Sequence, residues 1–137
     1  MSSTANMSLV LLTYNDKVLL MLRDNRVHSS DINTWCFIEV VKKNNDSFEE
    51  IILKEIQQET SLKLNSVNFL ATIPYNDEEK YIYHATLTSD NLNNIKRGEG
   101  KNLDFFTLQE IEKLHLAKLT KMFLSHHKDT IEKILHN

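Results

Sequence analysis

The sequence predicts a mixed α/β fold of the α+β type, in which helices cover a central sheet. Two observations favour this class. Pairs of apolar runs are separated by short polar turns, as in β-hairpins, and other segments repeat apolar residues with helical spacing. With 137 residues, 41% of them hydrophobic, the chain can bury one core and is too short for two ordinary domains. We therefore expect one domain over residues 1–137.

The strand predictions depend on runs rich in Val, Leu, Ile and aromatic residues. One hairpin is expected around the turn Asn15-Asp16, and a second around the acidic turn of residues 76–79. A further strand should precede the first helix, and a short one should follow the last glycine. The expected strands are residues 7–14, 17–23, 34–41, 67–75, 80–88 and 103–106.

Two capping-box patterns mark helix starts. Ser47 and Thr107 are each followed three residues later by Glu, whose side chain can reach back to the cap. The helix that opens at Ser47 should end near residue 60 or 61, and the helix after Thr107 should be short. A final amphipathic helix is expected over residues 119–135.

Two carboxylates of the first helix share its apolar face. At about 100° per residue, Glu55 and Glu59 lie within about 20° of Phe48 around the helix axis. Burying ionised carboxylates without a partner is costly, and these two also repel each other across one turn. A cation should therefore meet them. Either a Lys or Arg from a neighbouring strand, or a divalent metal such as Mg²⁺ that takes oxygen ligands, satisfies this requirement.

The composition argues against several function classes. The net charge is −3 and the basic residues are spread through the chain, so no nucleic-acid polymer is expected as a partner. The sequence shows no basic leader segment and no apolar run of membrane-spanning length, so we expect no membrane association and a cytoplasmic location. Cys36 is the only cysteine, which excludes an intrachain disulfide and a cysteine-based zinc site.

Residues 40–62 resemble the sequence box of the Nudix hydrolase family. That box runs Gly, five residues, Glu, seven residues, Arg-Glu-hydrophobic-any-Glu-Glu-any-Gly-hydrophobic, and its spacing fits this sequence without gaps. Glu55, Glu59 and the apolar residues at positions 56 and 62 match the box. Asp46 stands, conservatively, at its first Glu.

Four positions depart from the box. Val40 and Ser61 stand at its two glycines, Lys54 replaces its Arg, and Gln58 replaces the first of its paired Glu residues. A β-branched residue cannot take up positive φ at the low cost that glycine has, and Lys lacks the planar fork with which Arg holds a carboxylate. We therefore expect a weakened metal site.

The resemblance extends over nearly the whole chain. It implies a Nudix-like α/β/α sandwich, with a mixed central sheet flanked by the box helix and a C-terminal helix. Arg23, at the end of the second strand, is similar to a basic residue that faces substrate in the family. The only two glycines of the chain flank Glu99, and this loop is similar to one from which many members bring a further acidic residue to the metal.

The function that the resemblance implies is a Nudix-type hydrolase. Such an enzyme uses Mg²⁺ or Mn²⁺ to cleave the pyrophosphate linkage of a nucleoside diphosphate derivative or nucleotide. The implied site residues are Glu55 (catalytic and metal ligand), Glu59 and Glu99 (metal ligands), Gln58 (neutral ligand), Arg23 (substrate), and Lys54 and Asp46 (support of the box).

The implied partner is a small nucleotide-type molecule, and the assembly implied is a homodimer, which members of the family often form. The alternative hypothesis is a catalytically lapsed Nudix domain that binds a nucleotide or a protein without turnover. Gln58 and Val40 divide the two hypotheses, because each changes the metal site of an active member.

Overall fold

The computed structural model describes residues 7–22, 33–42, 47–96 and 102–136. Within these ranges the strands form one seven-stranded sheet with the order β3-β2-β1-β6-β5, to which β4 adds by pairing with β1 and β7 by pairing with β2. The pairs are antiparallel except β1 with β6, so the sheet is mixed, as expected. The strands are β1 Met7–Tyr14, β2 Lys17–Leu22, β3 Trp35–Cys36, β4 Ile38–Val41, β5 Asn68–Tyr75, β6 Glu78–Thr86 and β7 Asn102–Thr107.

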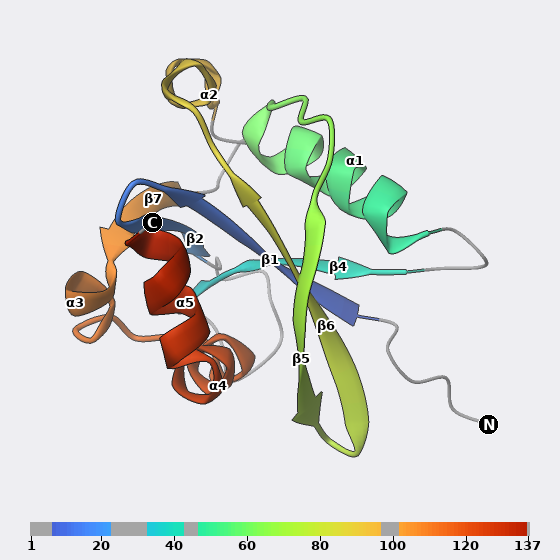
Figure 1. Ribbon diagram of the computed structural model, residues 1–137, viewed down its shortest axis with the longest axis vertical. Helices are drawn as coiled ribbons and strands as arrows, with labels where there is room; N and C mark the ends of the chain where they lie inside the picture. The colour runs from blue at the N-terminus through green and yellow to red at the C-terminus, as the bar shows by residue number, and fades with distance from the viewer. Residues whose placement is uncertain (1–6, 23–32, 43–46, 97–101, 137) are drawn as a thin grey trace.

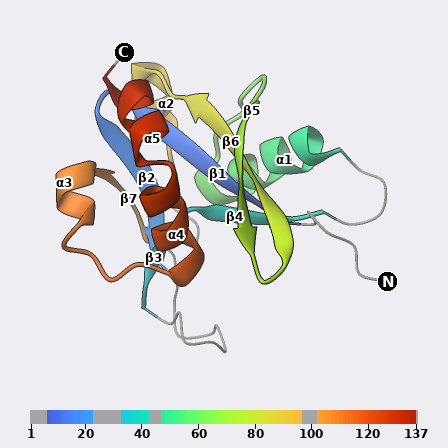
Figure 2. The same ribbon diagram turned by 60° about the horizontal axis from the view of Figure 1, so that its bottom comes forward.

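Helices lie on both sides of the sheet, with α1 on one side and α4 and α5 on the other (Figures 1 and 2). They are α1 Phe48–Thr60, α2 Ser89–Asn94, α3 Leu108–Ile111, α4 Lys118–His126 and α5 Lys128–Leu135. This arrangement confirms the predicted α/β/α sandwich. No helix in the described part of the chain is long and apolar enough to cross a membrane.

Strand β1 divides the interior into two cores, because successive side chains of a strand point to opposite faces. Val10 and Leu12 pack in the cluster that includes Ile52 and Ile56 of α1. The alternate residues of β1, at positions 9 and 11, pack instead in the cluster that contains Phe123 of α4. The buried strand therefore reads as a continuous apolar run, as is typical of a strand covered on both faces.

Both predicted hairpins form, and their turns use Asn and Asp where glycine is absent. Asn15 has φ 54° between β1 and β2, and Asn76 and Asp77 have φ 54° and 64° between β5 and β6. These short polar residues tolerate the left-handed region that tight hairpin turns require. The second turn is shorter than predicted, because β6 already begins at Glu78.

The predicted strand over residues 34–41 is divided in the structure into β3 and β4. Phe37, between them, donates its backbone N–H to the Thr120 hydroxyl of α4 at 3.1 Å. Its ring packs edge-on against Phe123, with centroids 5.5 Å apart. The backbone leaves the ladder at Phe37 because α4 supplies both a hydrogen-bond acceptor and an aromatic partner there.

The predicted final helix is also divided, into α4 and α5, at His127. This residue has φ −121° and ψ 32°, outside helical geometry, and its Nε2 lies 2.8 Å from the Thr72 carbonyl oxygen of β5. The helix α2, within a segment expected to be irregular, opens with a reciprocal capping box between Thr88 and Asn91. Asn in place of Glu at the third position had hidden this signal.

Candidate metal centre

Local interactions fix both ends of α1. At the start, the Ser47 hydroxyl accepts the Glu50 backbone N–H at 3.2 Å, and the Glu50 carboxylate accepts the Ser47 hydroxyl. At the end, Ser61 takes the left-handed conformation and donates its N–H to the Gln57 carbonyl at 2.8 Å. The helix therefore begins and ends at the predicted residues, which fixes the side of α1 that faces the sheet.

Aromatic contacts hold the first turn of α1 against the sheet. Phe48 packs on Tyr81 and Tyr83 of β6, with centroids 5.3 and 6.1 Å apart, and the Lys42 ammonium lies 4.9 Å from the centre of the Phe48 ring. Burial raises the pKa of Tyr83 above its usual value, with smaller contributions from the negative charge of Glu49 and from Tyr81. This anchoring orients the helix, and with it the carboxylates one and two turns further along.

The two predicted carboxylates lie on the inward side of α1. Glu59 is 6% exposed and Glu55 is half-buried, so the helical-wheel prediction of inward-facing acids is confirmed. Both side chains have interaction partners. Gln58 and Lys54 are exposed, and Lys54 forms no ion pair with another described residue. Lys54 is therefore not the cation that meets the pair.

Val40, at the position of the box glycine, lies in β4 opposite Ser8. Its side chain is buried in the same core as Phe48, and it is not among the described residues with positive φ. The segment continues as a regular strand at this point. Ser61, at the second box glycine, keeps the left-handed conformation that glycine would adopt, with φ 68°.

Three predicted site residues, Arg23, Asp46 and Glu99, lie outside the described residues. Within the described ranges no three His, Cys, Asp or Glu side chains are close enough to hold a metal ion. Glu55 and Glu59 remain as two carboxylates one helical turn apart. Their chemistry fits Mg²⁺ or Mn²⁺, since such hard ions are usually bound through one or two carboxylates, with water and substrate oxygens completing the shell.

An apolar pocket of about 290 Å³ lies close to the C-terminal end of α1. The Lys96 N–H, next to the pocket residue Ile95, donates to the Thr60 carbonyl at 2.9 Å and ties the segment after α2 to the helix end. Asp104 of β7 also lines the pocket, and its carboxylate accepts the N–H of Phe105 at 2.8 Å. Sequence reasoning assigned no role to Asp104, and its place in a strand paired with β2 was the available signal.

No protein-family model matches the sequence, and no curated protein does either. Solved structures do match. The NUDIX domain of Shewanella oneidensis NrtR, complexed with ADP ribose, superposes with a TM-score of 0.70 at 14% identity, covering 96% of this chain and 90% of that one. This chain has the Nudix fold.

Two further Nudix structures agree with this assignment. A NUDIX-family hydrolase from Clostridium perfringens gives a TM-score of 0.68 at 16% identity, covering 97% of this chain and 99% of that one. A bifunctional NMN adenylyltransferase/ADP ribose pyrophosphatase from Francisella tularensis, complexed with AMP and a Mn ion, gives 0.72 at 11% identity, with coverage of 96% and 43%. At these identities the likeness establishes the Nudix fold.

Proposed function

We propose that this protein is a Nudix-type hydrolase that cleaves the pyrophosphate linkage of a nucleoside diphosphate derivative or nucleotide. The observation that carries the proposal is the burial of Glu59, one turn after Glu55, on the inward side of α1 in a Nudix fold. A carboxylate is seldom retained in such a position unless it is paired with a cation. Glu59 therefore supports a cation site at this helix.

Each residue has a distinct role in the proposed reaction. Glu55 and Glu59 would hold Mg²⁺ or Mn²⁺, which when bound neutralises phosphate charge and acidifies a water molecule. Glu55 is the more exposed of the two and is suited to orient or deprotonate the attacking water. Glu99 is proposed as a third metal ligand and Arg23 as a phosphate contact, both by resemblance. Water adds to phosphorus as the bridging P–O bond breaks, which releases two phosphorylated fragments.

The substrate side of the proposal uses the pocket near the end of α1. Its apolar side chains come from β2, α2 with the residue that follows it, and β7, and they suit the nucleoside part of a substrate better than a phosphate. ADP-ribose is the first compound to test, because the NrtR structure contains it. Gln58 offers a neutral oxygen, and Lys54 and Asp46 are proposed to support the box residues.

The test is hydrolysis of ADP-ribose and a panel of nucleoside diphosphate compounds with Mg²⁺ or Mn²⁺. Glu59→Gln should abolish turnover, because it removes one negative charge from the proposed cage. Glu49→Gln is the matched control, since it makes the same change at an exposed position of the same helix. Equal activity of wild type and Glu59→Gln would contradict the proposed metal site.

A second variant asks whether the missing carboxylate limits the rate. Gln58→Glu restores the acid of the box at an exposed position that should tolerate it, and we expect about 10- to 100-fold higher activity. Gln57→Glu adds the same charge at the neighbouring exposed position and should leave the rate unchanged. Reversion of Val40 to glycine is unsuitable for this test, because it would empty a buried core position.

The alternative function, a domain that binds a nucleotide without turnover, is favoured by Gln58 and by the regular strand at Val40. Calorimetric titration with ADP-ribose separates the two. Binding without hydrolysis in wild type, together with turnover by Gln58→Glu, would assign a lapsed site. Hydrolysis by wild type would exclude that reading.

A further inference from the structure

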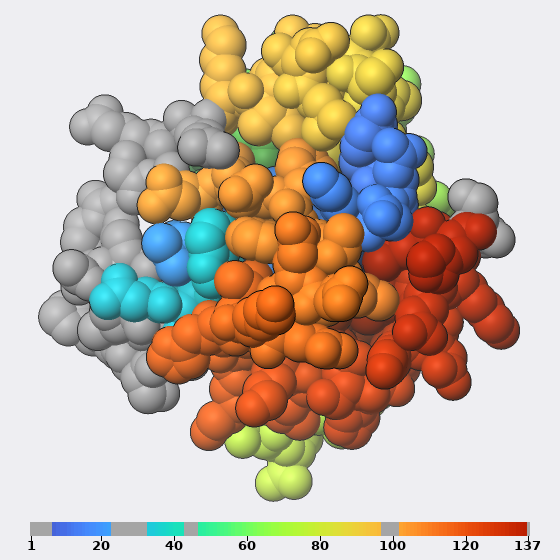
Figure 3. Space-filling model, turned by 90° about the vertical axis from the view of Figure 1, so that its left-hand side faces the viewer, coloured from blue at the N-terminus to red at the C-terminus, as the bar shows by residue number. Residues whose placement is uncertain are grey.

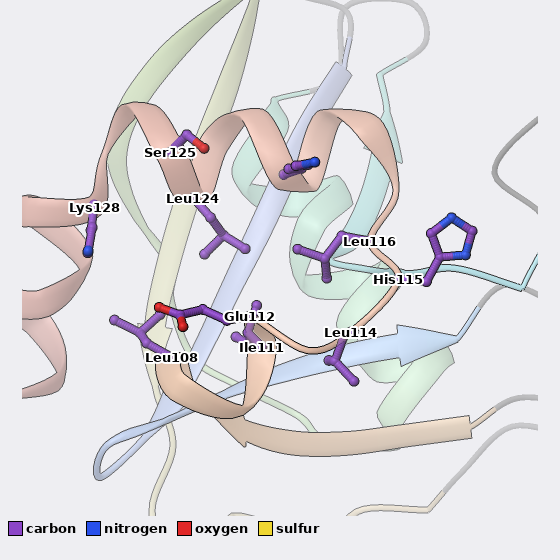
Figure 4. Close-up of a pocket in the computed structure, with 10 residues that line it drawn as sticks. Leu108, Ile111, Glu112, Leu114, His115, Leu116, Leu124, Ser125 and Lys128 are labelled. Carbon is purple, nitrogen blue, oxygen red and sulfur yellow. The ribbon is translucent and has the colours of Figure 1, made fainter.

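A second pocket lies across the sheet from α1, between α3, the residues that follow it, and α4. Its volume is about 410 Å³, within the range of small-molecule sites. Figure 4 shows Leu108, Ile111, Leu116 and Leu124 around this pocket. All four belong to the core on the α4 side of the sheet, whereas Glu55 and Glu59 lie on α1, which packs in the other core. The pocket is therefore separate from the proposed hydrolytic site.

The apolar lining of this pocket is open to solvent. Leu108, Leu116 and Leu124 are only partly buried, although they pack against a core of fully buried residues. Figure 3 shows the face on which residues 102–125, in orange to orange-red, lie beside α5 in red. Clustered, half-exposed leucines around a concave site lose free energy in water and gain it when an apolar group covers them.

The charged residues around the pocket give it a positive character. Lys121 and Lys128 come from α4 and the start of α5, and neither forms an ion pair with another described residue. His115 also lines the pocket, and Glu112 is the one carboxylate of the lining. Two ammonium groups against one carboxylate leave a net charge of +2 − 1 = +1 with His115 neutral. The chemistry calls for an anionic group above an apolar one.

We propose that this pocket binds a small amphipathic anion, with an alkyl or aromatic body on the leucines and a carboxylate or phosphate head between Lys121 and Lys128. Leucine side chains supply affinity for the body without selecting its atoms. The two lysines select charge, because bringing an anion between unpaired ammonium groups is favourable whereas a neutral head gains nothing from them. The pocket volume, near the lower end of the usual range, limits the ligand to a small one.

The probes are octanoate, octyl phosphate and 1-octanol, which share one alkyl body and differ in the head. Each is titrated into ¹⁵N-labelled protein while amide chemical shifts are followed. We expect octanoate and octyl phosphate to shift resonances of residues 108–128 and to leave α1 unchanged, with 1-octanol binding about tenfold more weakly. Tighter binding of octyl phosphate than of octanoate would assign a phosphate head, and the reverse a carboxylate head.

The charge requirement is tested with Lys121→Gln combined with Lys128→Gln. This double variant should bind octanoate about tenfold more weakly, with the affinity for 1-octanol unchanged. Lys118→Gln with Lys133→Gln is the matched control. It removes the same charge from exposed positions of the same two helices outside the pocket, and should bind like wild type.

Three results would overturn this proposal. They are the absence of shifts at residues 108–128 with millimolar octanoate, equal affinity for octanoate and 1-octanol, and equal loss of binding in the two double variants. None of these measurements depends on hydrolysis. Failure of the proposed enzymatic function would therefore leave this test intact.

Discussion

Ser61 ends α1 in the left-handed region, with φ 68° and ψ 11°. A residue with a Cβ pays about 1–2 kcal/mol for this conformation, whereas glycine adopts it freely. After the extra chain entropy of glycine is subtracted, Ser61→Gly should raise the free energy of unfolding by about 0.5–1 kcal/mol. Urea denaturation measures the change.

The control for Ser61 is Ser66→Gly. Ser66 is exposed in the same connection between α1 and β5, and it is not among the described residues with positive φ. Glycine at this position brings only the entropy loss, so stability should fall by about 0.4–1 kcal/mol. A similar loss in both variants would show that the conformation of Ser61 carries no strain.

His84 makes stability depend on pH. It is half-buried on β6, with Nε2 2.9 Å from the Thr13 hydroxyl, and burial lowers its pKa below the usual value near 6.5. The unfolded chain therefore takes up the proton first on acidification. The stabilising contribution of neutral His84 is complete above about pH 6.5 and is lost as the pH falls through the folded pKa.

Replacement of His84 with Gln should flatten the loss of stability between pH 7.5 and 5.5, as measured by urea unfolding. His136→Gln provides the comparison, because His136 is exposed after α5. Its substitution should keep the wild-type slope. A slope for His84→Gln as steep as that of wild type would assign the pH dependence to other groups.

At the scale of elements, Thr120 couples α4 to the interruption between β3 and β4. Its hydroxyl accepts the Phe37 N–H, and both residues are fully buried. Thr120→Val keeps the shape but leaves the N–H unsatisfied, which should cost about 1–3 kcal/mol. Amide hydrogen exchange at Phe37 should accelerate in this variant.

Thr120→Ser tests the same bond from the other side. It keeps the acceptor oxygen and removes a methyl group, so Phe37 should remain protected even though some packing is lost. Slow exchange in Thr120→Val would mean that the hydrogen bond does not hold the strand interruption.

At the scale of the whole molecule, the two cores share one sheet and should unfold together. Ile52 of α1 and Ile131 of α5 are both fully buried, one in each core. Ile52→Ala and Ile131→Ala should each cost about 2–5 kcal/mol. Because β1 serves both cores, transitions followed by far-UV circular dichroism and by Trp35 fluorescence should coincide in each variant. Separate transitions would show that the two faces unfold independently.

Local signals account for the parts that were predicted from the sequence. Polar turns placed the hairpins, Ser47 placed the start of α1, and the 3.6-residue period placed Glu59 on its inward side. Each signal acts over a few residues, so it survives whatever the rest of the chain does. The Nudix fold could be recognised from the spacing of one box although four of its positions differ.

The sequence by itself therefore determined the fold and the helix that carries the acids, because turns, caps and helical periods are encoded by neighbours in the chain. Only the tertiary structure decided the division of the strand at Phe37 and of the last helix at His127, because each depends on a partner far away in sequence, Thr120 and Thr72. The same applies to the pocket between α3 and α4. Its leucines and lysines become one site only when the segment after β7 folds back against the sheet.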